Sequence, residues 1–147
     1  MVLYYASGDA PAAERFTGFF DCGSGMLSSY ALPKKLPAWI QDEDLDFYVQ
    51  QVRESGFRGP LNWYRNIDRN WKAGAAMPDA KLTQPALFIA GEHDVVVAGF
   101  AKSAYERLEE NMPQPGKKAL IPGKGHWIQQ KSPAEANRLM IEFLKGL

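Results

Sequence analysis

Asp94 and His126 are the two residues whose types and spacing predict acid–base chemistry. Asp94 follows a short apolar run over residues 85–90, and His126 follows a second one over residues 118–122. A carboxylate beside an imidazole holds the ring in one tautomer and stabilises its protonated form. The pattern therefore predicts a general base and the acid that orients it.

Each of these residues also has a structural explanation. An Asp after a strand often starts a turn or caps the next helix, and His126, between Gly125 and Trp127, could be a packed loop histidine. Because Asp94 and His126 each come directly after a predicted strand, we favour a catalytic role for the two together. His93 precedes the acid in the same turn and has no strand end of its own, so we interpret it as a surface or supporting residue.

Two parallel strands and their helices would position this pair. Both apolar runs are typical of strands buried on both faces of a sheet, and residues 99–111 are expected to form the crossover helix between them. Because working groups collect at the carboxyl ends of such strands, Asp94 and His126 should meet there. A capping box over residues 132–135, with Pro133 at the first helical position, predicts a final helix to the end of the chain. The fold class is α/β.

The first half of the chain, to about residue 80, is predicted to consist of helices and loops. Pro11 would open a short helix, and the glycines, serines and prolines over residues 22–37 predict a loop. Asp42 would be the N-cap of one helix, and a further helix is expected over residues 59–71. The Gly-Ser-Gly within the loop lacks the Lys-Ser/Thr ending of a phosphate-binding loop.

Composition excludes several function classes. The 147 residues carry 17 basic and 17 acidic side chains and so have zero net charge, which argues against nucleic-acid or anionic-membrane binding. The single cysteine, Cys22, cannot form an intramolecular disulfide or a zinc site of several thiolates, and it favours a reducing compartment, the cytoplasm. Neither a basic leader nor a membrane-length apolar run is present.

Three segments together resemble the cap and C-terminal part of the α/β-hydrolase epoxide hydrolases of the soluble, bacterial type. They are GFRGPLNWYRN over residues 56–66, AGEHD over residues 90–94 and GKGHW over residues 123–127. The resemblance covers essentially the whole chain, and Asn-Trp-Tyr-Arg-Asn is its most diagnostic part. It implies a partial α/β-hydrolase fold, with a helical cap over residues 1–80 and the last two strands and helices of the core over residues 81–147.

The resemblance also implies roles for individual residues. In that family an Asp nucleophile opens an epoxide to an alkyl-enzyme ester, two cap tyrosines bind the epoxide oxygen, and a His–acid pair activates the water that releases the vicinal diol. Tyr64 would be the second cap tyrosine, Asp94 the acid and His126 the base, while Trp127 and Val96 would line the substrate pocket. Without the resemblance, Tyr64 would be interpreted as a core aromatic and the two pocket residues as packing. No cofactor or metal is implied, and the substrates would be an apolar epoxide and water.

The sequence departs from the family pattern at the nucleophile. It contains no Gly-x-Asp-x-Gly, no Gly-x-Ser-x-Gly and no His-Gly-x-Pro motif. We therefore expect the nucleophile and oxyanion hole in an N-terminal half upstream of Met1, of roughly 150 residues, as the rest of the same protein or as a separate chain. If Leu3-Tyr4-Tyr5 matches the stretch that follows the first cap tyrosine in the family, Met1 falls on the position of that tyrosine. Two strands are also fewer than the about four to six of a usual sheet, so this chain alone is expected to be inactive.

Three alternatives remain open. A haloalkane or haloacid dehalogenase shares the ester chemistry but does not need a proton-donating tyrosine. A serine esterase would differ in its nucleophile. The chain could also be a non-catalytic binding module or remnant that keeps the cap pocket.

Overall fold

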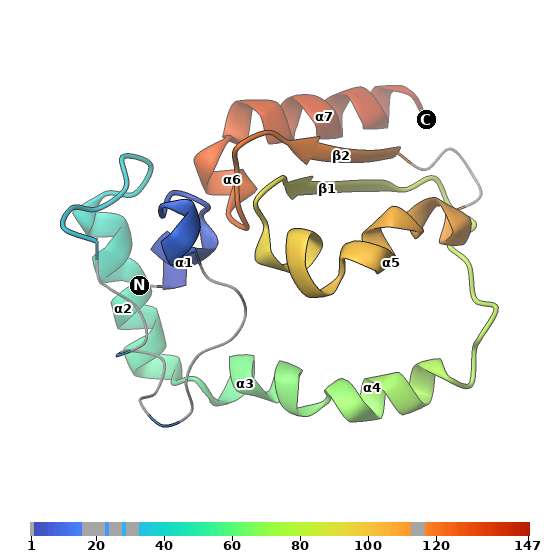
Figure 1. Ribbon diagram of the computed structural model, residues 1–147, viewed down its shortest axis with the longest axis horizontal. Helices are drawn as coiled ribbons and strands as arrows, with labels where there is room; N and C mark the ends of the chain where they lie inside the picture. The colour runs from blue at the N-terminus through green and yellow to red at the C-terminus, as the bar shows by residue number, and fades with distance from the viewer. Residues whose placement is uncertain (1, 16–22, 24–27, 29–32, 113–116) are drawn as a thin grey trace. The chain divides into compact units, whose positions relative to one another are not determined.

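The computed structural model describes residues 2–15, 23, 28, 33–112 and 117–147 (Figure 1). Met1, Cys22 and most of the loop expected over residues 22–37 lie outside the described residues. The chain divides into two compact units, one formed by Met1–Trp39 with Leu82–Leu147 and the other by Ile40–Lys81. The first unit thus contains residues from both sides of the boundary expected near residue 80, and the assignment of residues 1–80 to a cap stays a prediction.

The first unit contains a parallel pair of strands. Strand β1 (Leu87–Gly91) pairs with β2 (Lys117–Ile121) so that Ile89 lies opposite Ala119. Both strands are confirmed to within two residues of their expected positions. The last residue of each strand, Gly91 in β1 and Ile121 in β2, is buried, and this is the edge on which the predicted pair of residues was expected.

The connection between the strands is broken into short pieces. A π-helical segment η2 (Val96–Phe100), helix α5 (Lys102–Glu106) and a 3-10 turn η3 (Leu108–Asn111) replace the single helix expected over residues 99–111. That expectation is wrong because the backbone leaves the helical region at Gly99 (φ −105°, ψ −108°), at Ala101 (φ −107°, ψ 14°) and at Arg107 (φ −97°, ψ 12°). Glycine has no Cβ to disfavour such a conformation.

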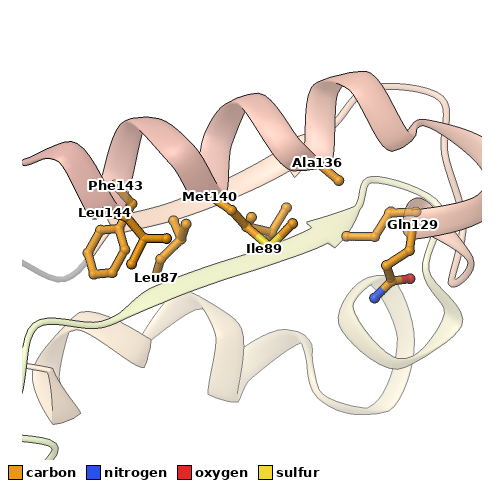
Figure 2. Close-up of a pocket in the computed structure, with 8 residues that line it drawn as sticks. Leu87, Ile89, Gln129, Ala136, Met140, Phe143 and Leu144 are labelled. Carbon is orange, nitrogen blue, oxygen red and sulfur yellow. The ribbon is translucent and has the colours of Figure 1, made fainter.

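Two C-terminal helices cover one face of the strands. Helix α6 (Ile128–Lys131) is followed by α7 (Pro133–Lys145), and Ile121, Ile128 and Ala136 form a buried cluster with Ile89 and Leu139 packed against it. The expected capping box at Ser132 is absent, because no side chain caps the helix and Glu135 instead receives two hydrogen bonds from Arg138. Apolar side chains of β1 and α7, among them Leu87 and Phe143, border a hollow of about 420 Å³ (Figure 2).

The N-terminal part of the first unit begins with helix α1 (Val2–Ala6) and a 3-10 turn η1 (Ala12–Glu14). Pro11 precedes that turn as its N-cap, one position earlier than expected. The segment between the two helices contains Gly8, whose φ of +76° is a conformation that favours glycine. This turn redirects the chain after α1.

The second unit consists of helices α2 (Asp42–Ser55), α3 (Arg58–Arg65) and α4 (Ile67–Gly74). The N-cap of α2 is Gln41 rather than Asp42, because the backbone amide of Gln41 donates to the Asp44 carboxylate in a capping box. The helix expected over residues 59–71 divides at Asn66, whose side-chain amide donates to the carbonyl of Asn62 at 2.8 Å. Such side-chain bonds compete with the regular helical pattern.

Candidate active site

The loops that follow β1 and β2 lie against each other. The amide of Glu92 donates to the carbonyl of Ile121 at 3.0 Å, and the amide of His93 donates to the carbonyl of Lys124 at 2.7 Å. A Cβ added at Gly91 would overlap the carbonyl oxygens of Lys124 and Gly125. The absence of a side chain at Gly91 therefore lets the second loop cross the end of β1.

This crossing brings together the acid and the histidine. Nδ1 of His126 lies 3.0 Å from Oδ2 of Asp94, while Oδ1 of Asp94 accepts the backbone amide of Val96 at 2.8 Å. Asp94 is buried, with 6% of its surface exposed, and the His126 side chain is 44% exposed. A buried carboxylate thus holds one edge of a ring that solvent can reach.

The two groups shift each other's protonation. Burial would raise the pKa of the Asp94 carboxyl, but the hydrogen bonds from His126 and Val96 and the charge of His126 together hold it below its usual range. The hydrogen bond to Asp94 and the charge of that carboxylate raise the pKa of His126 against the opposing effect of burial. The pair therefore favours a carboxylate beside an imidazole that readily accepts a proton.

A hollow of about 360 Å³ opens beside the pair. Asp94, Val96, His126 and Trp127 border it together with residues of β1. The Trp127 indole stands edge-to-face with the His126 ring, with 5.0 Å between the ring centroids, and its buried Nε1 has no hydrogen-bond partner among the described residues. The residues expected to line a pocket thus share a hollow with the histidine, and what that hollow binds stays a prediction.

An N-terminal segment, residues 6–9, supports the histidine from the other side. The amide of His126 donates to the carbonyl of Ala6 at 2.6 Å, and the amide of Gly125 donates to the carbonyl of Ser7 at 2.9 Å. A Cβ added at Gly125 would overlap this segment. The sequence carries no signal for this contact, because no periodicity relates residues so far apart in the chain.

Tyr64 belongs to the second unit, and His93 to the loop that follows β1. Tyr64 is on α3 in the second unit, with 67% of its surface exposed, and its relation to the pair remains a prediction from the sequence. Nε2 of His93 lies 4.0 Å from a carboxylate oxygen of Glu92, and its buried Nδ1 has no hydrogen-bond partner in the described part of the chain.

Two absences hold for the residues that the structure describes. No three His, Cys, Asp or Glu side chains gather there as ligands for a metal ion. None of the helices described combines the length and the hydropathy needed to cross a membrane.

Known proteins resemble this chain both in sequence and in structure. Epoxide hydrolase B of Mycobacterium tuberculosis is 44% identical over 125 residues, which are 85% of this chain and 35% of that protein. Epoxide hydrolase A of the same organism is 41% identical over 140 residues, 95% of this chain and 42% of that protein. A solved epoxide hydrolase from an endophytic Streptomyces superposes with a TM-score of 0.87 at 35% identity, covering 97% of this chain and 44% of that one. The chain is a homologue of the α/β-hydrolase epoxide hydrolases.

The similarity covers only part of each of these epoxide hydrolases. The chain spans less than half of the length of each of the three epoxide hydrolases described above, and no protein-family model matches it. Helices and a two-stranded parallel sheet agree with a partial α/β-hydrolase fold of the epoxide hydrolase type. Within this partial fold, Asp94 comes after β1 and His126 comes after β2.

Proposed function

We propose that this chain supplies the water-activating part of an epoxide hydrolase active site, with His126 as general base and Asp94 as its orienting acid. The observation that carries the proposal is the 3.0 Å contact between Nδ1 of His126 and the buried Asp94 carboxylate. With its Nδ1 proton donated to Asp94, a neutral imidazole presents its lone pair at Nε2. That nitrogen can take a proton from water.

The proposed reaction has two stages. An Asp nucleophile, supplied by a part of the protein that this chain does not span, attacks an epoxide carbon; one epoxide C–O bond breaks and an ester C–O bond forms. Water then attacks the ester carbonyl while His126 accepts its proton, and the Asp94 carboxylate stabilises the imidazolium. The bond between the ester carbonyl carbon and the diol oxygen then breaks, and His126 returns the proton to that oxygen. This step releases a vicinal diol and frees the carboxyl of the nucleophile.

Tyr64 acts in the first stage of this proposal. Ring opening leaves negative charge on the epoxide oxygen, and a phenol can donate a proton to it. The phenol recovers a proton at the end of the cycle, when the regenerated carboxyl of the nucleophile ionises. Residues 1–80 would belong to the cap that carries this phenol, and Val96 and Trp127 would contact an apolar epoxide. The sequence context of Tyr64 within Asn-Trp-Tyr-Arg-Asn supports this assignment.

A chimaera tests the proposal. This chain is joined behind the N-terminal part of Epoxide hydrolase A of Mycobacterium tuberculosis, and diol formation is assayed with an aryl epoxide. Intact-mass spectrometry then follows the His126→Gln variant, which should gain the mass of one epoxide because its ester no longer hydrolyses. His93→Gln is the matched control and should turn over normally.

The result also separates the rival functions. Unreduced diol formation by His126→Gln would overturn the proposal. Halide release from a haloalkane without epoxide opening would identify a dehalogenase. Binding of an epoxide-like urea by a folded chimaera that forms neither ester nor diol would indicate a binding module.

A further inference from the structure

The segment over residues 6–9 is fastened to the structure by Lys131, at the end of α6. Nζ of Lys131 donates to the carbonyl of Ser7 at 2.9 Å and to the carboxylate of Asp9. The Lys131 side chain is only 9% exposed. An ammonium group so well shielded from water is stabilised only where donors and acceptors are matched.

The carboxylate of Asp9 is the charged acceptor for Lys131, and it accepts hydrogen bonds from further donors. Its Oδ2 accepts Nε1 of Trp39 at 2.8 Å and the hydroxyl of Ser7 at 2.9 Å. Burial opposes ionisation, but the bonds from Lys131, Trp39 and Ser7 hold the pKa of the Asp9 carboxyl below its usual value. Asp9 is therefore a carboxylate at neutral pH, and three separate chain segments meet at it.

The same segment carries the carbonyls that bond the histidine loop. Ala6 accepts the amide of His126 and Ser7 accepts the amide of Gly125, and Ser7 is fully buried. The carbonyl of Ser7 is shared by Gly125 and Lys131. Lys131 and the backbone of His126 are thus coupled through one short piece of chain.

We propose that Lys131 is a positioning residue for His126: paired with Asp9, it holds residues 6–9 against the backbone of Gly125 and His126 and so keeps the imidazole on Asp94. Lys131 acts through these groups and does not touch the reacting atoms. The role of His126 in turnover rests on the function proposed above, whereas the positioning itself is a property of this chain.

The direction in which the pKa of His126 shifts when Lys131 is replaced distinguishes a positioning role of Lys131 from a purely electrostatic one. Removing the positive charge of Lys131 would by Coulomb's law raise the pKa of His126. Loosening the ring from Asp94 would lower that pKa toward its ordinary value, because the hydrogen bond to Asp94 is the largest contribution that raises it. The two effects have opposite signs.

Proton NMR titration of the full 147-residue chain makes this test, because the chain has two histidines and His93→Gln assigns their signals. In Lys131→Met the pKa of His126 should fall by about half a unit or more. Lys131→Arg, which keeps the charge and the donors, should restore the parent value. Lys124→Met removes a charge from the histidine loop itself and should not lower the pKa.

A second readout covers the case in which Lys131→Met does not fold. Asp9→Asn keeps an oxygen for Trp39 but removes the charge that pairs with Lys131, and it should speed hydrogen exchange at the His126 amide about tenfold. An unchanged or raised His126 pKa in folded Lys131→Met, or unchanged exchange in Asp9→Asn, would overturn the proposal. Both measurements need no epoxide, so a chimaera without turnover would refute the proposed function while leaving this inference intact.

Discussion

The backbone of Gly125 lies against the end of β1 at Gly91, so closely that a Cβ on Gly91 would overlap the Gly125 carbonyl oxygen. On its other side Gly125 meets Ala6 and Ser7, where a Cβ of its own would overlap their backbone atoms. Three stretches of chain therefore meet at one glycine, next to the histidine of the site. The glycine in Gly-His-Trp is a packing requirement here.

Gly125→Ala should consequently destabilise the protein by about 3 kcal/mol or more, because backbone atoms must separate to admit the methyl group. Gly123→Ala is the matched control: Gly123 has a φ of +65° but nothing within 4 Å of an added Cβ. It should cost only the about 1–2 kcal/mol of an alanine in the left-handed region. Urea denaturation of both variants measures the difference, and equal losses would contradict the packing argument.

Asp94→Asn should slow ester hydrolysis in the chimaera by about 10²- to 10⁴-fold, because the amide neither fixes the tautomer nor stabilises the imidazolium. The base must be neutral, so the rate rises with pH through the pKa of His126. Since Asp94 raises that pKa, the variant should reach its plateau at a lower pH. Single-turnover rates from pH 5 to 9 give the profile; an unshifted profile would contradict the pairing.

The Asp94–His126 pair should stabilise the fold over a limited pH range. The raised pKa of His126 gives stability that is complete below about pH 6.5 and is lost as the pH rises through the folded pKa. The lowered pKa of Asp94 gives stability that is complete above about pH 4 and is lost as the pH falls. The Tm difference between the parent and His126→Gln should therefore be largest between about pH 4 and 6.5. A difference that grows above pH 8 would refute this linkage.

Tyr64→Phe in the chimaera should slow formation of the alkyl-enzyme ester by about 10²-fold or more, because the opening epoxide loses its proton donor. Ester hydrolysis should be unaffected, since the phenol acts only in the first stage. Tyr48→Phe on α2, where the tyrosine is 39% exposed, is the control. Rapid-quench mass spectrometry separates the stages, and equal rates for both variants would remove Tyr64 from the mechanism.

Ile121→Ala should lower the free energy of unfolding by about 2–4 kcal/mol, because it leaves a cavity in the buried cluster of Ile121, Ile128 and Ala136. Ile141 on α7 is 50% exposed, so Ile141→Ala should change stability by less than about 0.5 kcal/mol. Thermal unfolding of the two variants compares them. Similar losses would show that the cluster is not the centre of the core.

The sequence by itself determined both strands, the final helix and the residues that follow the strand ends. Apolar runs bounded by glycine are local signals, and parallel strands bring their carboxyl ends to one edge, so the meeting of Asp94 with His126 could be inferred. The resemblance of residues 56–66, 90–94 and 123–127 likewise pointed to the family of which the chain is a homologue. The breaks at Asn66 and Gly99 were missed because side-chain bonding and glycine conformation overrode helical periodicity.

The tertiary structure decided how the histidine is supported. Asp9 and Lys131 lie 122 positions apart, and neither belongs to a motif or shares a periodic face with the other. Their pairing depends on where α1 ends and how the loop after β2 turns, which are settled by close backbone approach at Gly125 and by the burial of Ser7. Local propensities act over a few residues, whereas contacts of this kind form only when the whole unit has packed.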